Sequence, residues 1–175
     1  MARRRLETRA QVWAVLFAAV LGSIVVGPAA AQDAKGWVVS AGGFDFVGND
    51  KAVEAGVGFR FRPLFLNREK SVALVPAVGV SAQHEGSAWV YGAVRLDWEV
   101  SDGWYFTPTF GVSIYEEGDG KDLGGPIEFR SGIELSRRLR GGSRVGILFY
   151  HLSNSRIYEL NPGEESLVLT WSRGR

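Results

Sequence analysis

Three side chains near the end of the sequence could together form a base-activated serine nucleophile. His151 and Ser153 are two residues apart, so on a β-strand they point to the same face. A serine hydroxyl is a weak nucleophile until a neighbouring base takes its proton, and an imidazole at this spacing is a suitable base. A carboxylate that orients the imidazole would complete the set. Glu164 and Glu165 follow within the same segment and are the candidates for that role.

The alternation of the segment that follows selects one of these two carboxylates. Glu165 shares its face with the apolar residues Leu167, Leu169 and Trp171. Glu164 shares the opposite face with Ser166, Val168, Thr170 and Ser172. The pattern therefore predicts a Ser, His and Glu site that includes Glu165 and lies on the apolar face of its strand. That face is the outer, lipid-facing one if the strands form a membrane barrel. A polar cluster on a lipid face is costly and is more often functional than accidental.

An alternative interpretation of His151 and Ser153 stays open. The row of residues that contains them is apolar, but the opposite row of the same segment is apolar as well, so this strand alone does not decide its facing. The same spacing is expected if His151 and Ser153 belong to the polar rim of a barrel and have no catalytic role. Glu165 would then only be the first residue of a strand.

The strands that must hold these residues can be recognised in the sequence, because apolar residues alternate there with small or charged ones. Between residues 52 and 61, apolar residues take one face and small or charged residues take the other, which is typical of a strand with one apolar face. Clusters rich in Gly, Asn, Asp and Ser separate such segments. The sequence therefore predicts eight strands, near residues 36–47, 52–62, 71–83, 88–100, 103–115, 126–137, 144–153 and 165–172.

Two architectures could bury eight such strands. A soluble barrel or sandwich turns its apolar faces inward, whereas an outer-membrane barrel turns them to the lipid. An eight-stranded barrel has room inside only for side chains, which fits the faces rich in Gly, Ala, Ser and charged residues. The other faces carry bulky aromatic residues, including Trp98, Trp104, Phe106, Phe110 and Phe129. We therefore expect an all-β fold, an eight-stranded antiparallel transmembrane β-barrel of the outer membrane.

The strand count also predicts which end of the barrel holds the site. With an even number of strands, both termini can lie in the periplasm. The connections after the second, fourth and sixth strands are then periplasmic, and the other four are extracellular. The segment 151–166 lies at the extracellular end, at the level of the outer leaflet. Ion pairs are expected in the lumen between Glu54 and Arg60 and between Glu128 and Arg130.

The first 31 residues have the features of a secretory signal peptide. Four arginines precede an apolar run over residues 12–26, and three alanines at 29–31 form a cleavage site. The run is shorter than the roughly 20 residues that a membrane-spanning helix needs. The expected mature domain, residues 32–175, then has 16 basic and 18 acidic residues, because four arginines and one glutamate are removed.

Composition excludes several functional classes. The 20 basic and 19 acidic residues are nearly balanced, unlike a nucleic-acid-binding protein, which neutralises phosphates with clustered cations. The chain has no cysteine, so disulfides, thiolate metal sites and a cysteine nucleophile are excluded. No phosphate-binding loop, dinucleotide fingerprint or metal-ligand cluster is present. The other histidine, His84, is expected to be a solvated loop residue.

The segment that carries the three side chains resembles a known family. His-x-Ser-Asn at 151–154, followed by Asn-x-Gly-x-Glu at 161–165, is similar to the lipid A 3-O-deacylases of Gram-negative outer membranes, the PagL type. The stretch GKDLGGPIEFRSGIEL at 120–135 is similar to that family as well. The resemblance implies an eight-stranded barrel that hydrolyses the ester-linked acyl chain at position 3 of lipid A without a metal or other cofactor.

The resemblance also implies roles for individual residues. Nucleophile, general base and orienting acid would be Ser153, His151 and Glu165. Asn154 would contribute to oxyanion stabilisation or to local geometry, and Asn161 with Gly163 would shape the loop. The implied partners are lipopolysaccharide as substrate and the outer membrane, and a homodimer is an open alternative to a monomer.

The sequence departs from the family pattern in two places. Ser155 and Arg156 follow Asn154 where family members often have Ala and Gly, which weakens the case for an oxyanion contribution from that turn. Arg156 is expected either to meet a lipid A phosphate or to be solvated. The chain ends in Trp-Ser-Arg-Gly-Arg and not in a terminal aromatic residue, so assembly would use Trp171 or be inefficient. The competing function is a non-catalytic outer-membrane barrel with a structural, adhesion or resistance role.

Overall fold

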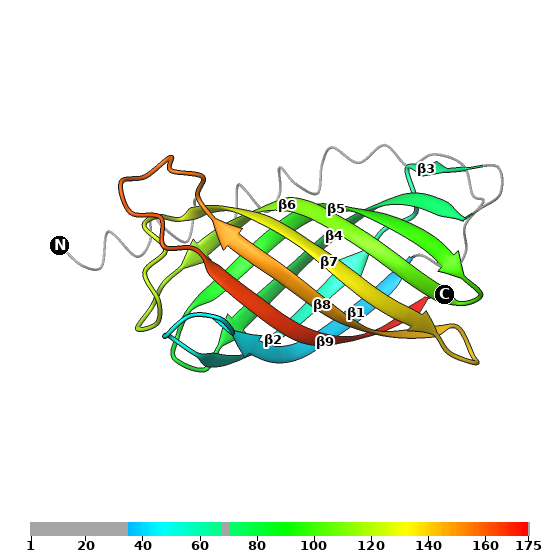
Figure 1. The fold of residues 1–175 in the computed structure, drawn as a ribbon, viewed down its shortest axis with the longest axis horizontal. Coiled ribbons are helices and arrows are strands. Elements are labelled where there is room, and N and C mark those ends of the chain that lie inside the picture. The colour runs from blue at the N-terminus through cyan, green and yellow to red at the C-terminus, as the bar shows by residue number, and fades with distance from the viewer. Residues whose placement is uncertain (1–34, 68–70, 175) are drawn as a thin grey trace, which may run out of the picture.

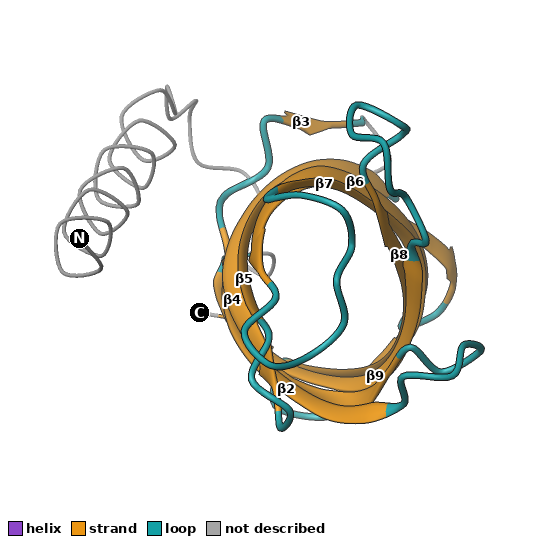
Figure 2. Ribbon diagram, turned by 90° about the vertical axis from the view of Figure 1, so that its left-hand side faces the viewer, coloured by secondary structure: helices purple, strands orange, loops and turns teal. Residues whose placement is uncertain are grey.

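The chain forms a closed antiparallel β-barrel (Figures 1 and 2). The computed structural model describes residues 35–67 and 71–174. Strand pairing runs in chain order from β4 to β9, continues from β9 to β1 and from β1 to β2, and closes between β2 and β4. The barrel strands are β1 (Gly36–Phe44), β2 (Ala52–Arg60), β4 (Val72–Gln83), β5 (Ala88–Ser101), β6 (Trp104–Glu116), β7 (Ile127–Arg138), β8 (Ser143–Ser153) and β9 (Glu164–Gly174). The predicted eight-stranded antiparallel barrel is confirmed.

The barrel strands begin and end within two residues of the predicted positions, except at the end of β1, and the structure adds one short strand. β1 ends at Phe44 and not at residue 47, because Asp45 adopts a left-handed φ of 49° that turns the chain out of the strand. An additional two-residue strand, β3 (Phe65–Leu66), pairs with Ala73 and Leu74 at the start of β4. β3 belongs to the connection between β2 and β4 and pairs with β4 beyond the end of β2, so it is not one of the eight strands of the closed ring.

Residues 1–31, the predicted signal peptide, lie outside the described residues. Within residues 35–67 and 71–174, no helix is long and apolar enough to cross a membrane.

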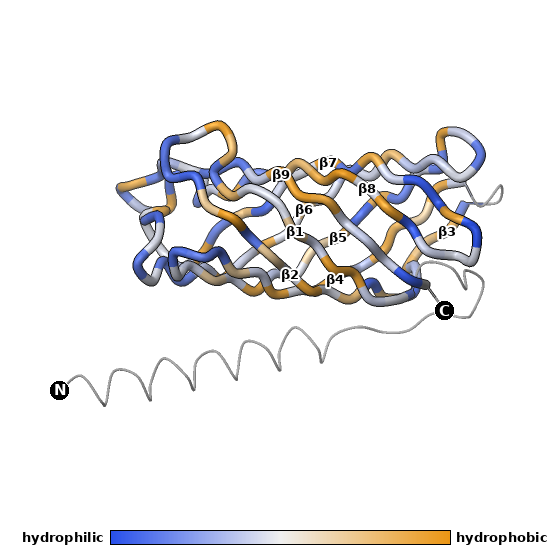
Figure 3. Tube along the Cα trace, turned by 90° about the horizontal axis from the view of Figure 1, so that it is seen from below, coloured by the Kyte–Doolittle hydropathy of each residue, from blue (hydrophilic) through white to orange (hydrophobic). Residues whose placement is uncertain are grey.

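Side chains alternate between the lumen and the exterior along the barrel strands. On β6, for example, Tyr105, Thr107 and Ser113 are buried in the lumen, whereas Phe110 is exposed. Hydrophobic and hydrophilic residues alternate along the strands in Figure 3. Large exposed hydrophobic residues occur on many of the strands and include Val57, Val94, Phe110, Ile133, Ile147 and Leu169. The apolar faces point outward, as the bulk of their side chains predicted.

Charged side chains fill one half of the lumen as an ion-pair network. Glu134 lies 3.3 Å from an Arg60 nitrogen and 2.8 Å from an Arg95 nitrogen. Asp97 lies 3.3 Å from Arg95 and 2.7 Å from Arg144. A lumenal ion-pair network is therefore present, but neither expected pair is part of it: Arg60 pairs with Glu134 and not with Glu54. Among the described residues, Glu128 and Arg130 form no ion pair with each other, and the Arg130 guanidinium lies over two tyrosine rings instead. The prediction considered neighbours along one strand. Arg95 and Asp97 are such neighbours on β5, but the Arg60–Glu134, Arg95–Glu134 and Arg144–Asp97 pairs join different strands across the lumen.

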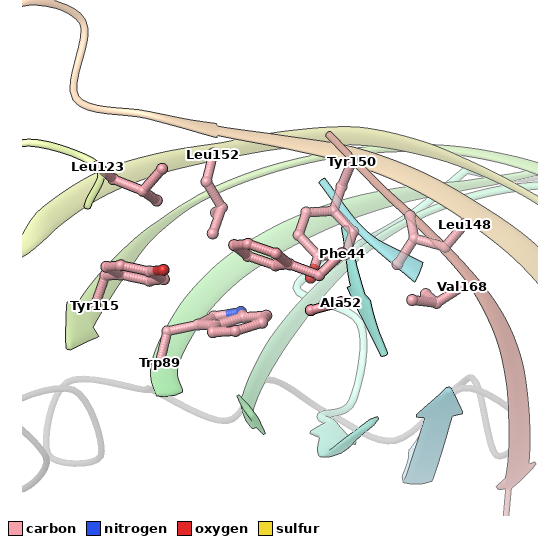
Figure 4. Packing of buried hydrophobic residues seen from close by; sticks show 9 residues of the cluster. All are labelled: Phe44, Ala52, Trp89, Tyr115, Leu123, Leu148, Tyr150, Leu152 and Val168. Atoms are coloured by element: carbon pink, nitrogen blue, oxygen red, sulfur yellow. The ribbon is translucent and has the colours of Figure 1, made fainter. Parts of the chain in front are cut away.

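The other half of the lumen is filled by aromatic and aliphatic side chains with a few polar contacts. Tyr150 donates its hydroxyl to Glu54, and the two oxygens are 2.6 Å apart. The Arg130 guanidinium lies over the rings of Tyr91 and Tyr150, 4.5 and 3.8 Å from their centroids. A buried cluster packs beside these groups and consists of Phe44, Ala52, Trp89, Tyr115, Leu123, Leu148, Tyr150, Leu152 and Val168 (Figure 4). Side chains thus occupy both halves of the barrel interior.

The connections divide between the two ends of the barrel as the strand count predicted. The connections after β2, β5 and β7 lie at the same end as the first described residues and the C-terminal end of β9. The other four connections lie at the opposite end, where the long segment between β8 and β9 is shown in orange at the left of Figure 1. We call this opposite end the loop end.

Loss of Glu134 is expected to destabilise the barrel. Glu134→Ala would leave Arg60 and Arg95 without their shared carboxylate in a buried position, and removing one partner of a buried ion pair typically costs ~3–5 kcal/mol. Urea unfolding in detergent, followed by tryptophan fluorescence, measures the change. Glu159→Ala, in the exposed part of the loop end, is the control and should stay within about 0.5 kcal/mol of the wild type. Equal stability of the two variants would contradict a structural role for the network.

Candidate active site

His151 and Glu165 face each other across the β8–β9 ladder. Their Cα atoms are direct partners in the strand register, so their side chains project from the same outer face. His151 Nδ1 lies 3.0 Å from Glu165 Oε1. The two side chains are 37% and 34% exposed, respectively, so both are reachable from outside the barrel. An imidazole held by a carboxylate in this way is the arrangement that the sequence predicted for a Ser, His and Glu site.

Ser153 is the last residue of β8 and lies two positions beyond His151 on the same face. Glu165 occupies the Nδ1 side of the imidazole, so Nε2 is the ring nitrogen left to accept the serine proton. Within residues 35–67 and 71–174, the Ser153 hydroxyl makes no hydrogen bond to His151. Such contacts often form only when substrate is bound.

The neighbouring Glu164 points the opposite way. Its side chain is fully buried in the lumen, where Oε2 accepts hydrogen bonds from the Asp45 amide at 3.3 Å and from the Ser166 hydroxyl at 2.9 Å. The structure therefore brings Glu165, and not Glu164, to His151. The alternation in β9 predicted the same choice because successive side chains on a strand alternate between faces.

Asn154 is a buried connector between two loops. Its Nδ2 donates to the carbonyl oxygens of Leu123 and Leu160, at 2.8 and 2.9 Å. Its Oδ1 accepts from the Arg156 amide at 3.0 Å, and its own amide donates to Asn161 Oδ1 at 2.9 Å. Both amide hydrogens of the side chain are therefore in use. Of the two expected contributions, the geometry gives Asn154 the positioning of the loop and leaves its side chain no hydrogen for an oxyanion.

Gly163 lies directly against the imidazole. A Cβ at this position would be 2.8 Å from His151 Cε1 and 3.4 Å from Nε2, and the glycine has a left-handed φ of 66°. Both features favour glycine, because the backbone of any other residue would be strained and its Cβ would displace the imidazole. Asn161 Oδ1 accepts the amide of Asn154, so Asn161 and Gly163 both make close contacts within the segment between β8 and β9.

Two residues other than glycine adopt the left-handed backbone conformation in the turn after Asn154. Ser155 and Arg156 have left-handed φ angles of 53° and 64°, which are uncommon for residues other than glycine. The hydrogen bond from the Arg156 amide to Asn154 Oδ1 closes this turn. The departure from small residues at these positions therefore coexists with a tight turn, and the Arg156 side chain is exposed beside the site.

Sequence reasoning missed two backbone groups that support the site. The amide of Phe46 donates to the carbonyl of Glu165 at 2.6 Å, and the carbonyl of Leu123 holds Asn154. Both belong to loops that are far from residues 151–165 in the sequence. The Gly124-Gly125 pair was the one sequence signal of close packing between these loops, because a Cβ on Gly124 would overlap the Leu160 carbonyl.

The remaining titratable groups add no second site. Among the described residues, no cluster of three or more His, Cys, Asp or Glu side chains could hold a metal ion. His84, expected to be solvated, accepts a hydrogen bond from the Val53 amide through Nδ1 at 3.1 Å, so it extends the pairing of β2 with β4 by one residue at the loop end.

Replacing Asn154 is expected to loosen the loop end without unfolding the barrel. Asn154→Ala removes three side-chain hydrogen bonds, each worth about 1 kcal/mol. Trypsin should then cleave after the exposed Arg156 several-fold faster than in the wild type. Heat-dependent migration on a denaturing gel reports whether the barrel is still folded. Asn49→Ala, on an exposed turn, is the control, and equal cleavage in both variants would contradict the role of Asn154.

Comparisons with known proteins identify the family and agree with the fold. The family model described as "Lipid A 3-O-deacylase (PagL)" matches residues 53–173. Lipid A deacylase PagL of Bordetella bronchiseptica is 26% identical over 108 residues, a match that covers 57% of this chain and 61% of that relative. The crystal structure of the outer membrane enzyme PagL superposes with a TM-score of 0.65 at 16% identity, over 80% of this chain and 99% of that one. The chain belongs to the lipid A 3-O-deacylase (PagL) family.

Proposed function

We propose that this protein is a lipid A 3-O-deacylase, a serine esterase that removes the ester-linked 3-hydroxyacyl chain at position 3 of lipid A in lipopolysaccharide. The observation that carries the proposal is the 3.0 Å contact between His151 Nδ1 and Glu165 Oε1, on the outer face and next to Ser153. Membership of the family supplies the substrate class. The match to the Bordetella relative spans 61% of its length.

The reaction follows from the roles of the three side chains. Ser153 Oγ attacks the ester carbonyl while His151 Nε2 takes its proton. Glu165 holds the imidazole in the required tautomer and stabilises its positive form. When the tetrahedral intermediate collapses, His151 returns the proton to the leaving 3-hydroxyl oxygen of the glucosamine. Water then attacks the acyl-serine by the same route, which releases the fatty acid and regenerates Ser153.

A donor is also needed for the oxyanion of the intermediate. Asn161 is the better candidate among the supporting residues. Its Oδ1 already accepts the Asn154 amide, so its Nδ2 is the group that can donate. The Asn154 side chain donates to Leu123 and Leu160 instead.

The surroundings of the site suit a lipid substrate in a membrane. Phe129 is the ladder partner of Ser153, and Phe149 pairs with Leu167 next to the His151–Glu165 pair on the same face. We place the barrel in the outer membrane with the loop end outside, so that lipid A diffuses laterally to the site. Residues 1–31 are the signal peptide and residues 32–175 the mature barrel in this proposal. One chain supplies all three side chains, so a homodimer is not required for the chemistry.

Loss of the nucleophile tests the proposed function. Ser153→Ala is expected to lower deacylation of lipid A by roughly 10³-fold or more, as for other serine hydrolases. Membranes that contain lipopolysaccharide are treated with each protein, and mass spectrometry detects lipid A that has lost one 3-hydroxyacyl chain. Equal deacylation by both proteins would remove Ser153 from the mechanism. No deacylation by either would favour the non-catalytic barrel.

The two adjacent glutamates provide a matched comparison. Glu165→Gln keeps the size of the side chain but removes the charge that stabilises the imidazolium, so kcat should fall by about 10²-fold or more. Glu164→Gln keeps an oxygen for the Asp45 amide and Ser166 and is expected to change kcat less than about threefold. The measurement is the rate of lipid A deacylation by folded protein. The reverse order of effects would mean that Glu165 does not orient His151.

A further inference from the structure

A buried ion pair joins two loops at the loop end of the barrel. Lys121 Nζ lies 2.7 Å from Asp45 Oδ1, and the two side chains are 13% and 1% exposed. Asp45 begins the connection between β1 and β2, and Lys121 belongs to the connection between β6 and β7. A charge pair so little exposed is costly to separate, so it couples the positions of the two loops.

The loop that contains Asp45 holds the orienting acid. The amide of Phe46 donates to the Glu165 carbonyl at 2.6 Å, and the amide of Asp45 donates to Glu164 Oε2 at 3.3 Å. Asp45 Oδ2 accepts the Asp50 amide at 2.8 Å, which closes this loop on itself. The start of β9, and with it Glu165, is therefore fixed by the β1–β2 connection.

The loop that contains Lys121 holds the segment beside the nucleophile. The Tyr115 hydroxyl donates to the Lys121 carbonyl at 2.8 Å. Two residues later, the Leu123 carbonyl accepts from Asn154 Nδ2 at 2.8 Å. Asn154 directly follows Ser153, so this loop sets where β8 ends. Leu123 and Tyr115 belong to the packed cluster in Figure 4, which makes their positions rigid.

We propose that Asp45 and Lys121 are positioning residues that set the alignment of Ser153 with the His151–Glu165 pair. Each partner of the ion pair is linked to one part of the site. Asp45 is followed by Phe46, whose amide binds the Glu165 carbonyl. Lys121 lies two residues before Leu123, whose carbonyl binds Asn154. A displacement of about 1 Å at a reacting group can cost on the order of 10²-fold in rate. The inference rests on the proposed ester hydrolysis at Ser153.

The test compares Lys121→Met with Lys51→Met. Methionine removes the ammonium but keeps a long side chain. The control residue, Lys51, is an exposed lysine of the β1–β2 connection, which also contains Asp45. Full-length proteins are assayed on lipid A by mass spectrometry and on a p-nitrophenyl fatty-acid ester by absorbance, with heat-dependent gel migration as the measure of folded barrel. We expect Lys121→Met to lower kcat on both esters by about tenfold or more, with KM within about twofold. Lys121→Arg should restore most of kcat, and Lys51→Met should match the wild type.

The outcomes separate this inference from the proposed function. An active wild type with unchanged kcat in Lys121→Met, or with a change in KM alone, would overturn the positioning role. An equal loss in Lys51→Met would do the same, because it would assign the effect to loop charge in general. Loss of the folded band in both Lys121 variants would make the pair a folding determinant instead. A wild type inactive on both esters would overturn the proposed function and the positioning role together.

Discussion

Every second residue of a barrel strand must point into a lumen that has room for little more than side chains, and the rest of this structure depends on that constraint. The closing pair between β2 and β4 leaves no edge in the ring. Three arginines and two carboxylates occupy one half of the interior, where each charge finds a partner from another strand. Packed aromatic residues occupy the other half. A substrate with long acyl chains has no room inside.

The proposed site lies on the outer surface, and the strand register fixes the position of two of its side chains. His151 and Glu165 are direct ladder partners, so backbone hydrogen bonds on both strands hold the imidazole and the carboxylate at a fixed separation. A shift of β9 by one residue would place Glu164 opposite His151 and turn Glu165 into the lumen. The ladder is a firmer support for a two-residue contact than a pair of loops would be.

Ser153, the proposed nucleophile, is held differently from His151 and Glu165. Ser153 ends β8, and the chain beyond it is fixed by Asn154, whose hydrogen bonds reach two separate connections. Left-handed backbone at Ser155, Arg156 and Gly163 lets the loop fold back over His151. The site thus joins a rigid strand pair to loops whose order comes from hydrogen bonds and from the buried pair of Asp45 with Lys121. Both parts must be in place for the nucleophile to meet its base.

The sequence alone determined the strand alternation, the eight-stranded barrel, its apolar exterior and the choice of Glu165 over Glu164. All of these follow from period-two placement of side chains, which is a local property of a β-strand. It did not determine the partners inside the lumen, where Arg60 pairs with Glu134, or the use of the Asn154 side chain. It also missed the support from Phe46, Leu123 and the Asp45–Lys121 pair. Only the tertiary structure decides these contacts, because closing the ring brings together loops that are separated by up to about 120 residues, and backbone amides and carbonyls carry no signal in the sequence.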